Sequence, residues 1–229
     1  ATHVGFFFNG KTDEIFPGEA RTIIPSVQVE CYADRPEMCA AEVTREIISR
    51  LSDSFPQVIV ANLANVDEVG HLEDRAAVIK AVRTVDGALA SIVEAARAAG
   101  AVVLVTADHG TAEEWLYPDG TVNTGHTKNP VPFVLLDHAS GDPEGWTLRE
   151  RGSLADVAPT LLEIAGLAAP AEMTGRSLIE RKPGAFTPAR TVLLLILDGW
   201  GHRAETYGNL IREAGPDAFD RIWRESPRA

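Results

Sequence analysis

The sequence predicts an α/β fold with a mostly parallel central sheet. Short apolar runs alternate with longer segments whose apolar residues recur every three or four positions, which is the pattern of strands alternating with helices. The apolar residues in the short runs follow one another without alternation, as is typical of strands buried on both faces. The predicted strands are residues 3–8, 58–63, 101–106, 132–136 and 192–197.

The clearest predicted helix lies between the second and third of these strands. Apolar residues recur from Val78 to Ala96 at spacings of three and four, and Gly100 supplies a stop. Further helices are predicted at residues 40–51, 154–165 and 217–224. We expect one domain over residues 1–229, with the polar, proline-containing stretch 180–190 as an internal linker.

Composition and charge exclude several classes of protein. The 229 residues are 45% hydrophobic and 24% charged, which is ordinary for globular domains, and the net charge is −12. That charge argues against nucleic acid or an anionic membrane surface as the main partner. The two cysteines form no disulfide framework, and the sequence contains neither a signal peptide nor a membrane-spanning apolar run. A cytoplasmic location is the default expectation.

Four short clusters contain residues that bind metals. They are Asp67 with His71, Asp108-His109-Gly110, His126, and Asp198 in Leu-Asp-Gly-Trp-Gly. The three carboxylates and three imidazoles are the ligands that two neighbouring divalent cations require.

Position in the predicted fold strengthens this interpretation. Asp67, Asp108 and Asp198 each follow a predicted strand, where loops of a parallel sheet converge on one crevice. An isolated Asp after a strand more often caps a helix or a turn, and an Asp67–His71 pair at a helix start has the same simple explanation. The occurrence of all the clusters together favours a metal site.

The remaining candidates are weaker. We expect His3, His138 and His202 to be surface or structural histidines, and Cys39 lacks the context of a reactive thiolate. Thr111, which directly follows the Asp-His-Gly run, is the best available hydroxyl for a nucleophile in this chain.

Two blocks of the chain resemble a known family. Residues 3–179 contain Phe-Phe-Phe-Asn-Gly, Phe-Pro-Gly-Glu-Ala-Arg, Arg-Pro-Glu-Met, the metal clusters, Asn-Pro-Val-Pro-Phe and Glu-Met-Thr-Gly-Arg-Ser-Leu, and residues 191–229 contain Ile-Leu-Asp-Gly-Trp-Gly. These runs resemble the cofactor-independent phosphoglycerate mutases of the alkaline phosphatase superfamily. The first block resembles that family's C-terminal part and the second its N-terminal part, so their order here is permuted.

The resemblance implies an alkaline-phosphatase-like three-layer domain that binds two divalent ions, manganese or alternatively zinc. One ion would be held by Asp67, His71 and His126, and the other by Asp108, His109 and Asp198. The implied reaction is phosphoryl transfer, which interconverts 3-phosphoglycerate and 2-phosphoglycerate, and the partner is a small phosphorylated substrate. The family's serine nucleophile, its inserted central domain and a lysine expected before Ala1 have no counterpart in these residues.

Three functions therefore remain open at this point. The chain is part of a mutase, or it is a phosphate or phosphonate ester hydrolase that uses a metal-activated hydroxide, or it is a non-catalytic metal-binding remnant. The product formed from 3-phosphoglycerate separates them: 2-phosphoglycerate, inorganic phosphate, or neither.

Overall fold

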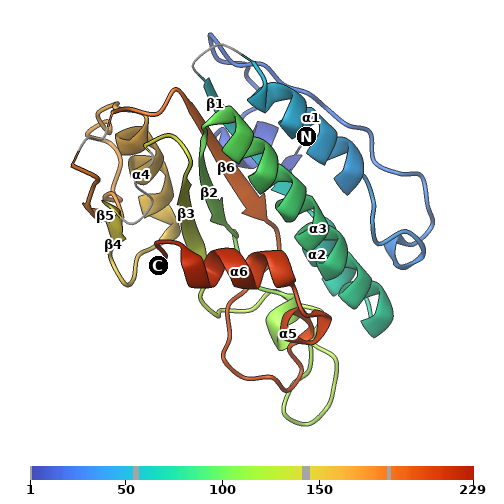
Figure 1. Ribbon diagram of the computed structural model, residues 1–229. Helices are drawn as coiled ribbons and strands as arrows, with labels where there is room; N and C mark the ends of the chain where they lie inside the picture. Colours follow the sequence, from blue (N-terminus) through green and yellow to red (C-terminus); the bar gives the residue numbers. More distant parts are fainter. Residues whose placement is uncertain (1, 54–56, 141–144, 185–186) are drawn as a thin grey trace.

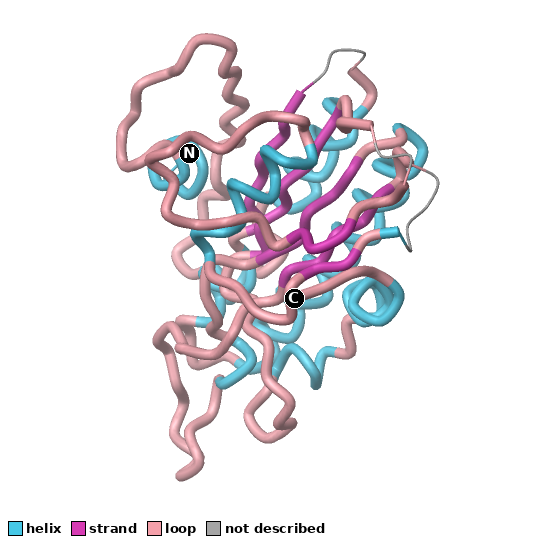
Figure 2. Tube along the Cα trace, turned by 90° about the vertical axis from the view of Figure 1, so that its left-hand side faces the viewer, coloured by secondary structure: helices cyan, strands magenta, loops and turns pink. Residues whose placement is uncertain are grey.

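A four-stranded sheet forms the centre of the protein in a computed structural model that describes residues 2–53, 57–140, 145–184 and 187–229. Its strand order is β1-β6-β2-β3. β1 (Gln57–Leu63), β6 (Thr191–Leu197) and β2 (Val102–Thr106) run parallel, and β3 (Phe133–Asp137) is antiparallel to β2. The α/β fold with a mostly parallel sheet is confirmed, and Figure 2 shows its strands side by side.

The last strand of the chain occupies the middle of the sheet. β6 pairs along its whole length with β1 and also pairs with all of β2. Leu193 and Leu195 are completely buried, and Val192 and Leu194 are 1% exposed. Residues 191–197 therefore join two strands that come from the first half of the chain.

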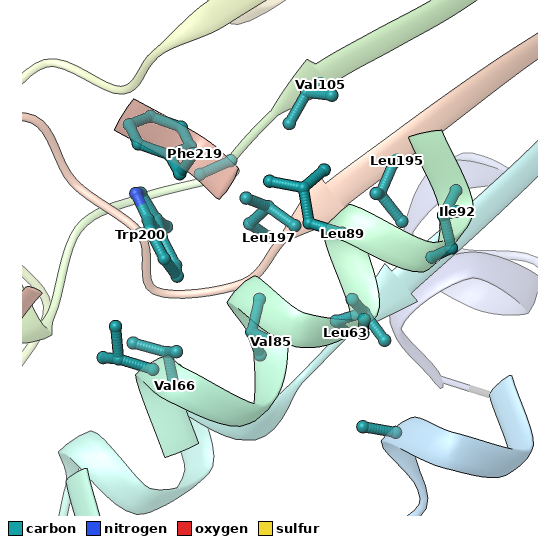
Figure 3. Packing of buried hydrophobic residues seen from close by; sticks show 14 of the residues in the cluster. Leu63, Val66, Val85, Leu89, Ile92, Val105, Leu195, Leu197, Trp200 and Phe219 are labelled. Atoms are coloured by element: carbon teal, nitrogen blue, oxygen red, sulfur yellow. The ribbon is translucent and has the colours of Figure 1, made fainter. Parts of the chain in front are cut away.

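Helices cover both faces of the sheet, because alternate residues of each strand point to opposite sides. On one face, Leu195 and Leu197 of β6 pack with α3 (Arg75–Ala99), whose Val85, Leu89 and Ile92 point toward the sheet (Figure 3). On the other face, Val192 and Leu194 belong to a second apolar cluster that includes residues of α4 (Val157–Ile164). The result is three layers, with α3 and α4 on opposite sides of the sheet (Figure 1).

The remaining helices lie on the α3 side or near the ends of strands. They are α1 (Ala40–Leu51), α2 (Asn65–Gly70), α5 (Leu210–Ala214) and α6 (Asp217–Glu225). α3 begins after Asp74, whose side chain accepts a hydrogen bond from the Ala77 N–H, and ends at Gly100 in the left-handed conformation, where the sequence predicted a stop.

Residues 3–8 do not form the predicted strand. They belong to a π-helical segment, Thr2–Phe8, which pairs with no strand among the described residues, and Phe7 is 57% exposed. An apolar run of this length does not by itself distinguish a strand from a helix, which explains the error. The chain then runs alongside α1 as a long loop, interrupted only by a 3₁₀ turn at Tyr32–Asp34 (Figure 1).

Two other boundaries also differ from the prediction. The helix expected from Leu154 begins as a 3₁₀ turn, Leu154–Asp156, because the side chains of Ser153 and Asp156 form a capping box there, and α4 follows it. The expected linker 180–190 starts inside β5 (Ile179–Arg181), which pairs with β4 (Thr147–Leu148). Residues 185 and 186 of that linker lie outside the described part of the chain.

Within the described ranges, no helix combines the length and the apolar composition that a membrane span requires.

Asp137, at the end of β3, organises the loop that follows it. One carboxylate oxygen accepts hydrogen bonds from the N–H groups of Ala139 (2.8 Å) and Ser140 (3.0 Å), and the other accepts from Trp146 Nε1 (2.7 Å) and the Ser140 hydroxyl. Burial alone would raise the pKa of Asp137, but these donors outweigh it and hold the pKa below its usual value.

We expect Asp137→Asn to lower the free energy of unfolding at pH 7 by about 1–3 kcal/mol, because it weakens hydrogen bonds to a charged group. A lowered pKa stabilises the folded state above the unfolded-state value, so the wild-type advantage should shrink as the pH falls below about 4. Urea unfolding at pH 7 and pH 3 measures both values. An equal difference at the two pH values would show that the ionised carboxylate is not the source of the stability.

Candidate metal centre

Three loops meet at the carboxyl ends of the parallel strands. Leu63 at the end of β1 is in register with Leu197 at the end of β6, and Thr106 of β2 pairs with Ile196. Asp67 therefore follows β1 in α2, while Asp108 and Asp198 follow β2 and β6 at the same edge. This is the convergence that the sequence predicted.

Gly199 allows the β6 loop to approach α2 closely. Its φ of +74° favours glycine, and a Cβ at this position would lie 2.7 Å from the Asp67 Cα. A residue with a Cβ would not fit at position 199. The glycine therefore lets the Leu-Asp-Gly-Trp-Gly loop place Asp198 beside Asp67.

Asp67, His71 and His126 form the first group of possible metal ligands. One ligand atom from each lies within 4.8 Å of the others. His71 Nε2 is 3.3 Å from an Asp67 carboxylate oxygen and 3.3 Å from His126 Nε2, and His126 Nε2 is 3.4 Å from the other Asp67 oxygen. Three ligand atoms thus surround one point at the mouth of the site.

A backbone contact fixes the tautomer of neutral His71. Its Nδ1 lies 2.7 Å from the Thr124 carbonyl oxygen, which can only accept, so Nδ1 carries the proton and Nε2 presents a lone pair to Asp67 and His126. Acceptors that face one another in this way require a cation or a proton between them. Although burial opposes it, the Thr124 carbonyl and Asp67 raise the pKa of His71, so a proton takes this place at lower pH.

The second group consists of Asp67, His109 and Asp198, again with ligand atoms within 4.8 Å of one another, whereas the expected set has Asp108 in place of Asp67. His109 Nε2 is 3.6 Å from Asp198 Oδ1 and 3.4 Å from Asp108 Oδ2. Burial and the neighbouring Asp198 carboxylate raise the pKa of Asp108 to about 6. The negative charges of the Asp108 and Asp198 carboxylates repel each other, and a bound cation would offset that repulsion.

The two carboxylate oxygens of Asp198 differ in their hydrogen bonding. The residue is 1% exposed, and its Oδ2 accepts hydrogen bonds from His3 Nδ1 (2.8 Å) and Asn62 Nδ2 (2.9 Å). Its Oδ1 is buried and has no hydrogen-bond partner among the described residues. A buried, unpaired carboxylate oxygen that faces an imidazole nitrogen fits a metal ligand well.

His3 is a structural histidine, which is one of the two roles expected for it, and its contact with the site is the new finding. It contacts the most buried carboxylate of the site, and the hydrogen bond to Asp198 raises the pKa of His3. No signal in the sequence connects two residues 195 positions apart. His3 supports a ligand and belongs to neither group of possible ligands.

Thr111 also supports a ligand. It is completely buried, and its hydroxyl donates a hydrogen bond of 2.8 Å to Asp67. Because the hydroxyl is engaged and shielded from solvent, the geometry does not favour its use as a nucleophile. His138 follows β3, His202 packs against the Trp223 ring and Cys39 Sγ donates to the Pro25 carbonyl, so all three lie outside the two groups.

Comparison with known proteins shows the family to which the chain belongs. A sequence profile described as "Metalloenzyme superfamily" matches residues 1–169. The chain belongs to the metalloenzyme superfamily. The matched part of this metalloenzyme includes Asp67, His71, Asp108, His109 and His126.

Similar proteins carry the name 2,3-bisphosphoglycerate-independent phosphoglycerate mutase. The one from Moorella thermoacetica is 52% identical over 177 residues, which are 77% of this metalloenzyme and 33% of the relative. The one from Thermosynechococcus vestitus is 45% identical over 197 residues, or 84% of this chain and 37% of the relative. The chain therefore spans about a third of the length of these curated relatives.

A solved structure shows the same fold relationship. A Leishmania mexicana phosphoglycerate mutase, crystallised at low cobalt concentration, superimposes with a TM-score of 0.65 at 29% identity, covering 79% of this metalloenzyme and 35% of that chain. The fold is thus alkaline-phosphatase-like α/β, as the resemblance implied.

Proposed function

We propose that this metalloenzyme binds two divalent ions and carries out the phosphoryl transfer of a cofactor-independent phosphoglycerate mutase. One ion would be held by Asp67, His71 and His126, and the other by Asp108, His109 and Asp198. The observation that carries the proposal is the unpaired, buried Oδ1 of Asp198 among these side chains, in a chain whose similar proteins are named as mutases.

The ligand chemistry supports manganese, with zinc as the alternative. The proposed ligands are carboxylates and imidazoles, which suit both ions, and none is a thiolate. When bound, two such ions offset the charge of a phosphoryl group and orient it for transfer. They would also explain how a chain with a net charge of −12 accepts an anionic substrate.

The chain's own residues hold the carboxylates in place. His3 and Asn62 occupy one oxygen of Asp198 and leave the other directed at His109. These hydrogen bonds overcome the effect of burial and lower the pKa of Asp198, so the carboxylate stays ionised. Thr111 similarly holds Asp67 in place through its hydrogen bond. The Asp67 oxygens lie 3.3 Å from His71 Nε2 and 3.8 Å from His109 Nδ1, so Asp67 is close to a histidine of each proposed site.

The substrate that fits this proposal is a small phosphate ester, 3-phosphoglycerate in one direction and 2-phosphoglycerate in the other. This interconversion is a step of glycolysis, which is consistent with a cytoplasmic location. We also retain the proposal that residues 1–229 form one domain, because β6 lies between strands from the earlier block of sequence.

The product formed from 3-phosphoglycerate tests the proposed function. The natural protein that carries this chain, loaded with Mn²⁺, should form 2-phosphoglycerate, which phosphorus NMR distinguishes from inorganic phosphate. His126→Ala should abolish the reaction, whereas His138→Ala, which changes a histidine outside both groups, should not. Release of inorganic phosphate alone would instead identify a hydrolase, and the absence of any product would contradict both activities.

A further inference from the structure

Glu113 is a buried carboxylate that the proposed chemistry does not use. It lies in a 3₁₀ turn (Ala112–Glu114) and is completely buried. Its Oε1 accepts hydrogen bonds from the Thr127 hydroxyl and from Asn129 Nδ2 (3.0 Å), while its Oε2 has no partner among the described residues. Burial of an ionisable side chain with one unpaired oxygen is costly, so its position calls for an explanation.

The Glu113 carboxylate contacts all three loops that carry His109, His126 and Asp198. Thr127 directly follows His126, Gly110 directly follows His109, and Gly201 lies three residues after Asp198. A Cβ on either Gly110 or Gly201 would overlap the Glu113 carboxylate, so both glycines leave room for it. The Thr127 N–H also donates to the Gly110 carbonyl (2.9 Å), which ties two of these loops together beside Glu113.

We infer that Glu113 is a positioning residue that sets the relative placement of His109, His126 and Asp198 for metal binding. This inference rests on the metal centre of the proposed function. The carboxylate acts through the Thr127 hydrogen bond on the loop of His126 and through direct packing on the loops of His109 and Asp198. Partners that orient ligands in this way commonly alter metal affinity by about 10–100-fold when they are removed.

The conservative substitution separates positioning from an effect of the negative charge. Glu113→Gln can keep an acceptor toward Thr127 and Asn129 and has nearly the same shape between the two glycines. Glu113→Ala removes the acceptor and the contacts with Gly110 and Gly201. The neighbouring Glu114 gives a matched control, because it shares Asn129 (2.8 Å) but is not among the groups that crowd the two glycines.

Titration of Mn²⁺ into the metal-free protein by calorimetry tests the inference, with circular dichroism as the check on folding. We expect Glu113→Ala to weaken Mn²⁺ binding by about 10–100-fold, and Glu113→Gln and Glu114→Ala to remain close to wild type. Thr127→Val, which replaces the hydroxyl with a methyl group of similar size, should weaken binding in the same direction and serves if Glu113→Ala does not fold.

Wild-type affinity in Glu113→Ala, or in Thr127→Val where Glu113→Ala is unfolded, would overturn the inference while leaving the metal centre intact. Equal losses in Glu113→Ala and Glu113→Gln would also overturn it, because the retained acceptor and shape would then have no effect. If the wild-type protein itself takes up no Mn²⁺, the proposed function fails together with this inference.

Discussion

Asp67→Asn is expected to abolish high-affinity binding of the metal ion proposed for Asp67, His71 and His126. Asp67 is the one carboxylate that belongs to both groups of possible ligands, with His71 and His126 on one side and His109 and Asp198 on the other. Asparagine keeps the size of the side chain and an acceptor for the Thr111 hydroxyl, so the fold should persist. The loss of the charge should weaken affinity by more than the ~100-fold that removal of an outer partner costs.

Metal analysis after desalting measures this effect, with Glu68→Gln as the matched control. Glu68 is the next residue of α2 and its side chain is 37% exposed, but it belongs to neither group of ligands. It should therefore retain both ions. Two ions bound by Asp67→Asn would refute the placement of Asp67, and equal losses in both variants would point to a general effect of negative charge.

A polypeptide that ends at residue 190 is expected to lose cooperative folding. β6 lies between β1 and β2, so its removal leaves those two strands without their shared partner. It also removes Leu193, Leu195 and Leu197 from the core. Loss of one buried leucine side chain costs about 2–5 kcal/mol, whereas a whole domain is stable by only about 5–15 kcal/mol.

Thermal unfolding followed by circular dichroism in the near ultraviolet detects this loss. A peptide of residues 187–229, added in trans, should restore a cooperative transition if the two blocks form one domain. A polypeptide 1–190 that unfolds cooperatively at the same temperature as the whole chain would contradict this account and would make residues 191–229 an independent appendage.

The sheet and half of the site followed from simple features of the sequence. Continuous apolar runs identified β1, β2, β3 and β6, and the carboxyl ends of parallel strands placed Asp67, Asp108 and Asp198 at one edge. Neither feature depends on contacts between distant parts of the chain, because strand burial and strand direction are sufficient.

The parts that the sequence did not predict depend on contacts between distant residues. The hydrogen bond from His3 to Asp198 and the packing of Glu113 against Gly201 join residues far apart in the chain. The apolar run at residues 3–8 was wrongly predicted to be a strand. A strand in the sheet and an exposed π-helical turn differ in burial, and the periodicity of a short apolar run does not report burial.

Anomalous X-ray diffraction from crystals of the Mn²⁺-loaded protein tests the central claim most directly. We expect two manganese peaks, one bordered by Asp67, His71 and His126 and the other by Asp108, His109 and Asp198. A peak only elsewhere on the protein, or no peak beside Asp198, would contradict the proposed two-metal centre.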